Sequence, residues 1–127
     1  MFAESKAFSG FAVDDLQKML EFYGETLGVK TTVLDEENGL AQLELAGGDR
    51  PTVVYVKPDF VPATYTILNF PVEDVEKAVD ELSERGVAFE RYEGFDQDEK
   101  GINKGPGPRI AWFKDPAGNI LSVLEQQ

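Results

Sequence analysis

The chain of 127 residues carries 24 acidic and 12 basic side chains, which gives a formal net charge of −12. A charge of this sign and size repels nucleic acid and anionic membrane surfaces, so we expect neither as a partner. The composition is that of an ordinary globule, and we expect one domain over residues 1–127.

Histidine and cysteine are both absent from the sequence. Without cysteine the chain can form neither a disulfide nor a thiolate nucleophile. Because disulfides are absent and the sequence shows no pattern of a leader peptide, we expect a cytoplasmic protein. Without histidine the chain lacks the commonest general base and the commonest transition-metal ligand. We therefore expect neither a metal nor another cofactor.

The first half of the chain predicts the element order β-α-β-β-β. A helix is expected after Asp14 and Asp15, which can cap it, because apolar residues between 16 and 27 recur at helical spacing; Gly28 ends it. The strands are expected over residues 7–13, 30–34, 40–45 and 52–56.

The same order returns after a connection over residues 57–63. A helix is expected between Asp74 and Gly86, and strands over residues 65–70, 87–92, 110–113 and 120–124. The last two strands flank Asp115-Pro116-Ala117-Gly118-Asn119, in which proline and glycine favour a hairpin turn. Two in-register matches, one at the helix starts and one at the helix ends, predict an internal repeat of modules 7–57 and 64–126.

The repeat, together with the segments Phe22-Tyr23-Gly24-Glu25-Thr26-Leu27-Gly28 and Asp115 to Asn119, resembles the vicinal oxygen chelate superfamily. That superfamily includes glyoxalase I, bleomycin-resistance proteins, fosfomycin-resistance proteins and extradiol dioxygenases. The resemblance implies an α+β fold in which two βαβββ modules form a curled, barrel-like sheet with a cavity. It also implies a homodimer.

The resemblance further implies where a metal would bind. Metal-dependent members place His, Gln or Glu at four cavity-facing positions, and three of these correspond here to Phe8, Ile67 and Ser122. The fourth falls within residues 52–57, which hold no His, Gln, Glu or Asp. A catalytic divalent cation binds imidazole or carboxylate, so the metal site of the family is expected to be missing.

Alternation along the strands predicts a pocket instead. If Phe8, Ile67 and Ser122 mark its inner face, then Tyr65 and Asn69 share that face. Trp112, the single tryptophan, can stack on a flat or cationic ligand, and Tyr55 and Tyr92 are weaker candidates for the same role. The predicted ligand-binding residues are Phe8, Tyr55, Tyr65, Ile67, Asn69, Trp112 and Ser122.

The segment 93–108 is long for a connection within a compact domain and is rich in glycine. Long loops of this kind are often lids or binding loops. Its acidic residues Asp96, Asp98 and Glu99 are candidates for contact with a cationic ligand.

Three interpretations of function remain open from the sequence. The first is a metal-independent protein that binds and sequesters a small-molecule ligand or antibiotic. The second is a lyase, isomerase or dioxygenase of the same superfamily that uses ligands not recognised here. The third is a non-catalytic dimeric domain whose strand faces form a filled core.

Overall fold

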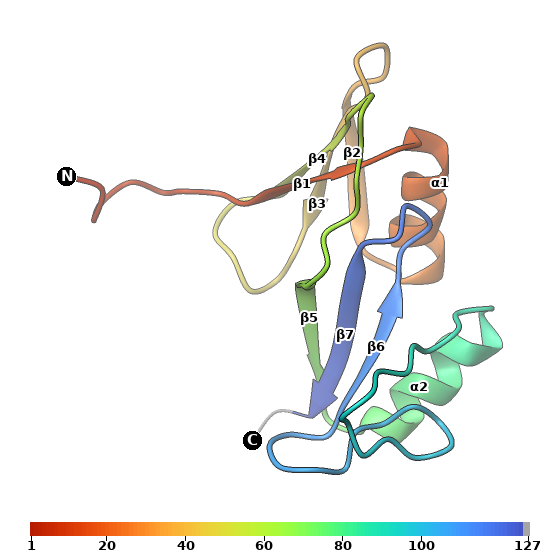
Figure 1. Cartoon of the computed structure of the whole chain (residues 1–127). Helices are drawn as coiled ribbons and strands as arrows, with labels where there is room; N and C mark the ends of the chain where they lie inside the picture. The colour runs from red at the N-terminus through yellow and green to blue at the C-terminus, as the bar shows by residue number, and fades with distance from the viewer. Residues whose placement is uncertain (126–127) are drawn as a thin grey trace. The chain divides into compact units, whose positions relative to one another are not determined.

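The structure is a computed structural model that describes residues 1–125 (Figure 1). The chain divides into two compact units, residues 1–62 and the part of the chain from Ala63 onward. Each unit places a helical segment against one small sheet, so the predicted α+β class is confirmed. Within residues 1–125, no helix is long and apolar enough to cross a membrane.

The sheet of the first unit has four strands in the order β1-β4-β3-β2. The strands are β1 (Gly10–Val13), β2 (Lys30–Asp35), β3 (Leu40–Glu44) and β4 (Thr52–Val56). β1 runs parallel to β4, and the other neighbours are antiparallel. The first strand therefore begins three residues later than predicted, and Phe8 lies outside it.

The helical segment of the first unit is not one regular helix. It begins as α1 (Leu16–Leu20), which Asp15 caps by accepting a hydrogen bond from the Lys18 amide at 3.0 Å. It continues as a π-helix, η1 (Glu21–Thr26), in which the Leu27 amide donates to the Phe22 carbonyl. The predicted cap is confirmed, and the predicted regular spacing up to residue 27 is wrong.

One face of this sheet is covered by the helical segment, as Figure 1 shows. Buried side chains of the sheet lie on that face, among them Ala41, Leu43 and Val54. The ring of Phe11 lies 5.7 Å from the ring of Tyr23 on η1. Because side chains alternate along a strand, Ala12 and Tyr55 lie on the opposite, helix-free face, where they are register partners.

The sheet of the second unit has three strands in the order β5-β7-β6. The strands are β5 (Thr66–Val72), β6 (Ile110–Lys114) and β7 (Ile120–Glu125). Its helix is α2 (Val75–Glu84), capped by Asp74 through the Lys77 amide. Here too the first strand of the unit is parallel to the last, so the two units share this pairing, although the second sheet has one strand fewer.

The strand predicted over residues 87–92 does not form a ladder. Phe89 makes an isolated bridge to Phe113, and the Glu90 amide donates to the Trp112 carbonyl at 2.8 Å. Beyond this point, the side chain of Gln97 forms hydrogen bonds with backbone groups that would otherwise pair with a neighbouring strand. Its amide donates to the Glu90 carbonyl and accepts from the Tyr92 amide, at 2.9 and 2.8 Å.

The hairpin between β6 and β7 forms as predicted. The Asp115 amide donates to the Asn119 carbonyl at 2.9 Å, and Gly118 has a φ of 97°, which other residues rarely adopt. The Asp115 side chain is buried and accepts from the amides of Ala117 and Asn119. The hairpin fixes the register of β6 against β7, and this register positions the candidate site.

Candidate functional site

A row of three predicted residues crosses the sheet of the second unit. Ser122 on β7 is the register partner of Asn69 on β5 and of Trp112 on β6. Register partners share a face, and the next row, Phe70, Val123 and Ala111, belongs to the opposite face. We call Asn69, Ser122 and Trp112 the cross-strand row.

The cross-strand row lies on the face of the sheet away from α2. On the other face, buried Phe113 stacks against Phe89, and Val75 and Val79 of α2 are buried. The row itself mixes one aromatic ring with two neutral polar groups. The Ser122 hydroxyl is buried and donates to the Asn69 Oδ1 at 2.6 Å, which leaves the amide nitrogen of the exposed Asn69 to solvent.

An aromatic wall stands beside the row. The ring of Trp112 is 5.6 Å from Tyr92 in an edge-to-face arrangement and 5.0 Å from Phe95. Phe95 is 50% exposed although it is a large apolar side chain. The sequence ranked Tyr92 as a weaker candidate and missed Phe95; the available signal for Phe95 was one aromatic residue in a loop of glycines and acids.

The Tyr92 hydroxyl is buried without a hydrogen-bond partner, and among residues 1–125 it is the one side-chain polar atom in that condition. Burial raises the pKa of Tyr92, and the nearby Glu90 carboxylate raises it further. The phenol is therefore protonated at neutral pH and is available as a hydrogen-bond donor. Glu90 itself pairs with Lys114, 3.5 Å away.

The structure does not bring the other residues of the second unit into the row. Tyr65 precedes β5 and is 70% exposed. Ile67 falls at a register shift between Thr66 and Leu68, where the ladder with β7 is interrupted. A binding role for either residue stays a prediction.

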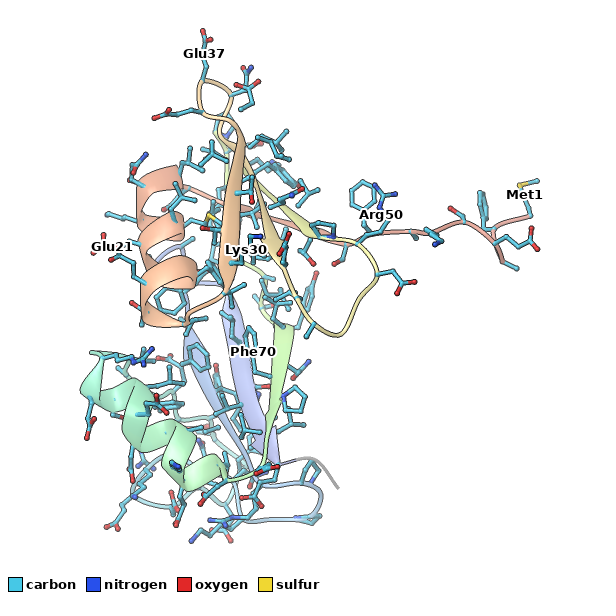
Figure 2. All side chains as sticks on the ribbon, turned by 180° about the vertical axis from the view of Figure 1, so that it is seen from behind. Met1, Glu21, Lys30, Glu37, Arg50 and Phe70 are labelled. Atoms are coloured by element: carbon cyan, nitrogen blue, oxygen red, sulfur yellow. The ribbon has the colours of Figure 1, made fainter. Side chains whose placement is uncertain are left out.

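The two predicted residues of the first unit are both partly exposed. Phe8 lies before β1, and the Arg50 guanidinium stands 4.4 Å from the centre of its ring; Figure 2 shows Arg50 beside the N-terminal segment. Tyr55 is 41% exposed on the helix-free face of the first sheet. Both can offer a ring to a ligand, and their role stays a prediction.

The residues at the metal positions of the family do not fit a metal. Phe8 and Ile67 have no donor atom, and the Ser122 hydroxyl is bonded to Asn69. Residues 1–125 contain no group of three or more carboxylate, imidazole or thiolate side chains placed to hold an ion. The side chains at these positions are thus unlike the ligands that bind a catalytic divalent cation.

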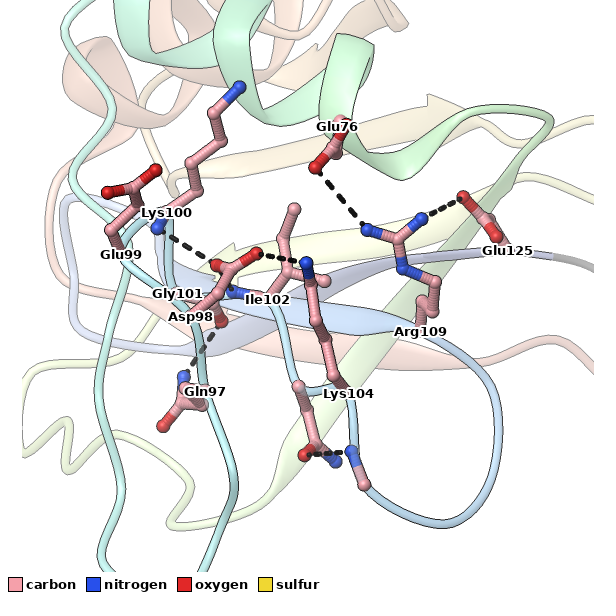
Figure 3. A network of polar contacts seen from close by, with 12 residues as sticks. Glu76, Gln97, Asp98, Glu99, Lys100, Gly101, Ile102, Lys104, Arg109 and Glu125 are labelled. Carbon is pink, nitrogen blue, oxygen red and sulfur yellow. Dashed lines mark hydrogen bonds and ion pairs between the residues drawn. The ribbon is translucent and has the colours of Figure 1, made fainter.

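The loop over residues 93–108 is held by its own polar contacts, part of which Figure 3 shows. Asp98 Oδ1 accepts from the amides of Lys100 and Ile102, and its carboxylate pairs with Lys104 at 3.3 Å. Burial opposes the charged form, but these contacts together lower the pKa of Asp98. The Asp98 carboxylate therefore fixes the loop, and the prediction that it meets a cationic ligand is not supported by its surroundings.

Two further features surround this loop. Arg109 pairs with Glu76 and Glu125 at 3.5 and 3.7 Å (Figure 3). A shallow cavity of about 340 Å³ lies between α2 and the loop. The cavity includes Glu99 from the acidic candidates of the loop and none of the seven predicted ligand-binding residues. Its lining consists of Val79, Asp80, Ser83, Val87, Ala88, Phe89, Arg91, Glu99, Lys100 and Gly101.

Two α+β units, each with its first strand parallel to its last and with one helical segment against its sheet, define the class of fold. The sequence model of the Glyoxalase/Bleomycin resistance protein/Dioxygenase superfamily matches residues 7–123, and the chain belongs to this superfamily. The predicted resemblance and fold are thereby confirmed.

Individual relatives agree with this membership. The uncharacterized protein YraH of Bacillus subtilis (strain 168) is 30% identical in a 126-residue alignment, and the match covers 89% of this chain and 91% of YraH. TnmS3, an antibiotic binding protein from Streptomyces sp. CB03234, is 26% identical with a TM-score of 0.72, and 98% of each chain is covered. A superfamily member from Sphaerobacter thermophilus DSM 20745 is 25% identical with a TM-score of 0.69, covering 94% of this chain and 97% of its own.

Proposed function

We propose that this protein binds a planar, aromatic small molecule on the helix-free face of its second sheet, without a metal, and sequesters it. The observation that carries the proposal is the cross-strand row with its aromatic wall. A ligand ring can stack against Trp112, while the Asn69 amide, which the buried Ser122 hydroxyl orients, fixes the ligand through a hydrogen bond.

The chemistry of this face favours binding over turnover. The row holds a hydroxyl, an amide and an indole, none of which exchanges a proton readily near neutral pH. Glu90, whose carboxylate acts on Tyr92, pairs with Lys114. The ligand that fits such a face is uncharged or weakly charged, and the net charge of −12 is not part of its recognition.

Two parts of the proposal remain, metal independence and sequestration. The residues at the metal positions of the family support the first, and the relatives support the second. Metal independence is supported by the residues Phe8, Ile67 and Ser122, which differ from the imidazoles and carboxylates of a catalytic site. Sequestration is supported by the likeness to TnmS3, which is described as an antibiotic binding protein.

We extend the proposal to a cytoplasmic homodimer. Tyr55 is 41% exposed on the helix-free face of the first sheet, and an exposed large aromatic side chain favours contact with another protein surface. The absence of cysteine supports a reducing compartment.

The fluorescence of Trp112 provides the test, because it is the only tryptophan and reports on one place. The protein is titrated with a panel of planar aromatic compounds in buffer that contains EDTA. We expect saturable quenching by at least one compound, weakened by Asn69→Ala. The matched control is Gln17→Ala, which removes an exposed amide from α1 and leaves the affinity unchanged. Binding that disappears with EDTA and returns with a divalent ion would contradict the proposal, as would no binding by the panel.

A further inference from the structure

The Tyr92 hydroxyl is a buried hydrogen-bond donor that has no acceptor in the part of the chain that the structure describes. A buried donor without a partner destabilises the free protein, and native proteins rarely keep one without a use. Among the side-chain nitrogen and oxygen atoms of residues 1–125, the Tyr92 hydroxyl alone meets this condition. The ring that carries it contacts Trp112 edge to face, so the donor belongs to the same aromatic wall as the proposed ligand face.

Nothing in its surroundings makes the hydroxyl a base or a structural support. The charged neighbour is the Glu90 carboxylate, which acts on the phenol through its charge, and no hydrogen bond joins the two. The backbone of Tyr92 is held independently, since its amide donates to Gln97 Oε1 at 2.8 Å. Removing the hydroxyl therefore leaves the contacts that position the ring.

We propose that the Tyr92 hydroxyl donates a hydrogen bond to the bound ligand, and that the ligand is a planar ring system carrying a carbonyl oxygen. This inference rests on the proposed function and specifies its ligand class. A carbonyl is a neutral acceptor that lies in the plane of a conjugated ring, so one flat molecule can stack on Trp112 and accept from a donor at its edge. The free amide nitrogen of Asn69, at the other end of the cross-strand row, is a second donor for a ligand rich in acceptors.

The ligand reaches the hydroxyl by replacing Phe95. The hydroxyl is buried in the free protein, so a side chain has to move before a ligand can accept from it. Phe95 packs on Trp112 at 5.0 Å, is half exposed, and follows Gly94 in the loop. Its ring can turn to solvent without disturbing the contacts made by Gln97 and Asp98, which hold the loop further along.

The test compares two flat probes that differ by the acceptor. 9-Fluorenone carries a carbonyl on a planar tricycle, and fluorene has the same rings without it. Both are titrated against Trp112 fluorescence, with N-acetyltryptophanamide as the correction for probe absorbance. We expect the protein to prefer fluorenone by about fivefold to tenfold, the ratio that one neutral hydrogen bond provides.

Tyr92→Phe is expected to lose this preference by binding fluorenone more weakly and fluorene unchanged. Its melting temperature is expected to stay the same or rise, because the substitution removes an unpaired buried hydroxyl. The matched control is Ser83→Ala, which removes an exposed hydroxyl from α2 in the same unit and keeps the preference. Phe95→Ala is expected to bind fluorenone more tightly.

The outcomes separate this inference from the proposed function. If neither probe binds, the proposed function fails for flat aromatic ligands and the inference fails with it. If both probes bind but Tyr92→Phe keeps the preference for fluorenone, or is clearly destabilised, the inference is wrong and the proposed function stands. Weaker fluorenone binding by Phe95→Ala would overturn the replacement of Phe95.

Discussion

Replacing Asp115 by alanine tests the role of the hairpin that sets the register of the candidate site. The Asp115 side chain is 4% exposed and accepts hydrogen bonds from the Ala117 amide, the Asn119 amide and the Asn119 Nδ2, at 3.0, 2.9 and 3.1 Å. The two donors on Asn119 are buried as well. Each would lose this acceptor and could not reach bulk water.

The size of the effect follows from those two donors. Leaving a buried donor unsatisfied costs about 1–3 kcal/mol, so we expect Asp115→Ala to lower the free energy of unfolding by roughly 2–5 kcal/mol. That is a large part of the about 5–15 kcal/mol typical of a whole domain. Asp35→Ala is the matched control, because Asp35 accepts from the Asn38 amide and Nδ2 in the same manner, at 3.1 and 2.7 Å, but in an exposed turn.

The assay is urea unfolding at pH 7, followed by circular dichroism and by Trp112 fluorescence. We expect a much smaller loss for Asp35→Ala than for Asp115→Ala, with similar dependence on urea concentration in both variants. Equal losses in the two variants would show that burial of the Asp115 contacts does not stabilise the hairpin, and the reasoning would be refuted.

Three further predictions concern the site and the loop beside it. Trp112→Phe should keep the fold, with a loss of about 1 kcal/mol in urea unfolding, and should bind fluorenone more weakly in a thermal-shift titration; complete unfolding would show that Trp112 is part of the core. Ser122→Ala should change stability by less than about 1 kcal/mol, because the exposed Asn69 can bond to water, and it should weaken ligand binding, whereas an unchanged affinity would remove Ser122 from the site. Asp98→Ala should be about 1–2 kcal/mol less stable at pH 7. Because the folded-state pKa of Asp98 is lowered, its stabilisation is present above the unfolded pKa of about 4 and is lost as the pH falls through the folded value, so the gap to the unmodified protein should close in acid. A gap independent of pH would contradict this.

Local signals predicted much of the fold. The helix caps Asp15 and Asp74 accept the hydrogen bonds expected of them, and Gly28 and Gly86, beyond the helices, both have positive φ. The strand over Thr52–Val56 and the hairpin at Asp115 were also predicted correctly. These features depend on residues that are close in sequence, so the sequence displays them directly.

Other features depend on partners that local patterns do not reveal. The π-helical turn over Glu21–Thr26 interrupts a spacing that reads as a regular α-helix. The segment over residues 87–92 has strand-like residues, but the Gln97 amide occupies the backbone groups of Glu90 and Tyr92. No propensity scale anticipates such a contact from a neighbouring loop.

The candidate site was predicted in part for the same reason. Alternation along β5 and β7 placed Asn69 and Ser122 on one face, and the register of the hairpin added Trp112. The prediction of the aromatic wall lacked Phe95. This residue lies in a loop, where the sequence has no periodicity that shows which way a side chain points. The unpaired condition of the Tyr92 hydroxyl is a property of the packed structure and has no sequence signal.

Native mass spectrometry of protein purified without a metal-affinity step tests the central claim most directly, because a single spectrum reports bound metal, bound organic molecules and subunit number. We predict subunits free of divalent ions, and, after addition of fluorenone, one organic adduct per subunit that is weakened by Asn69→Ala. A stoichiometric divalent ion on each subunit would contradict the metal-independent account and would favour an enzyme.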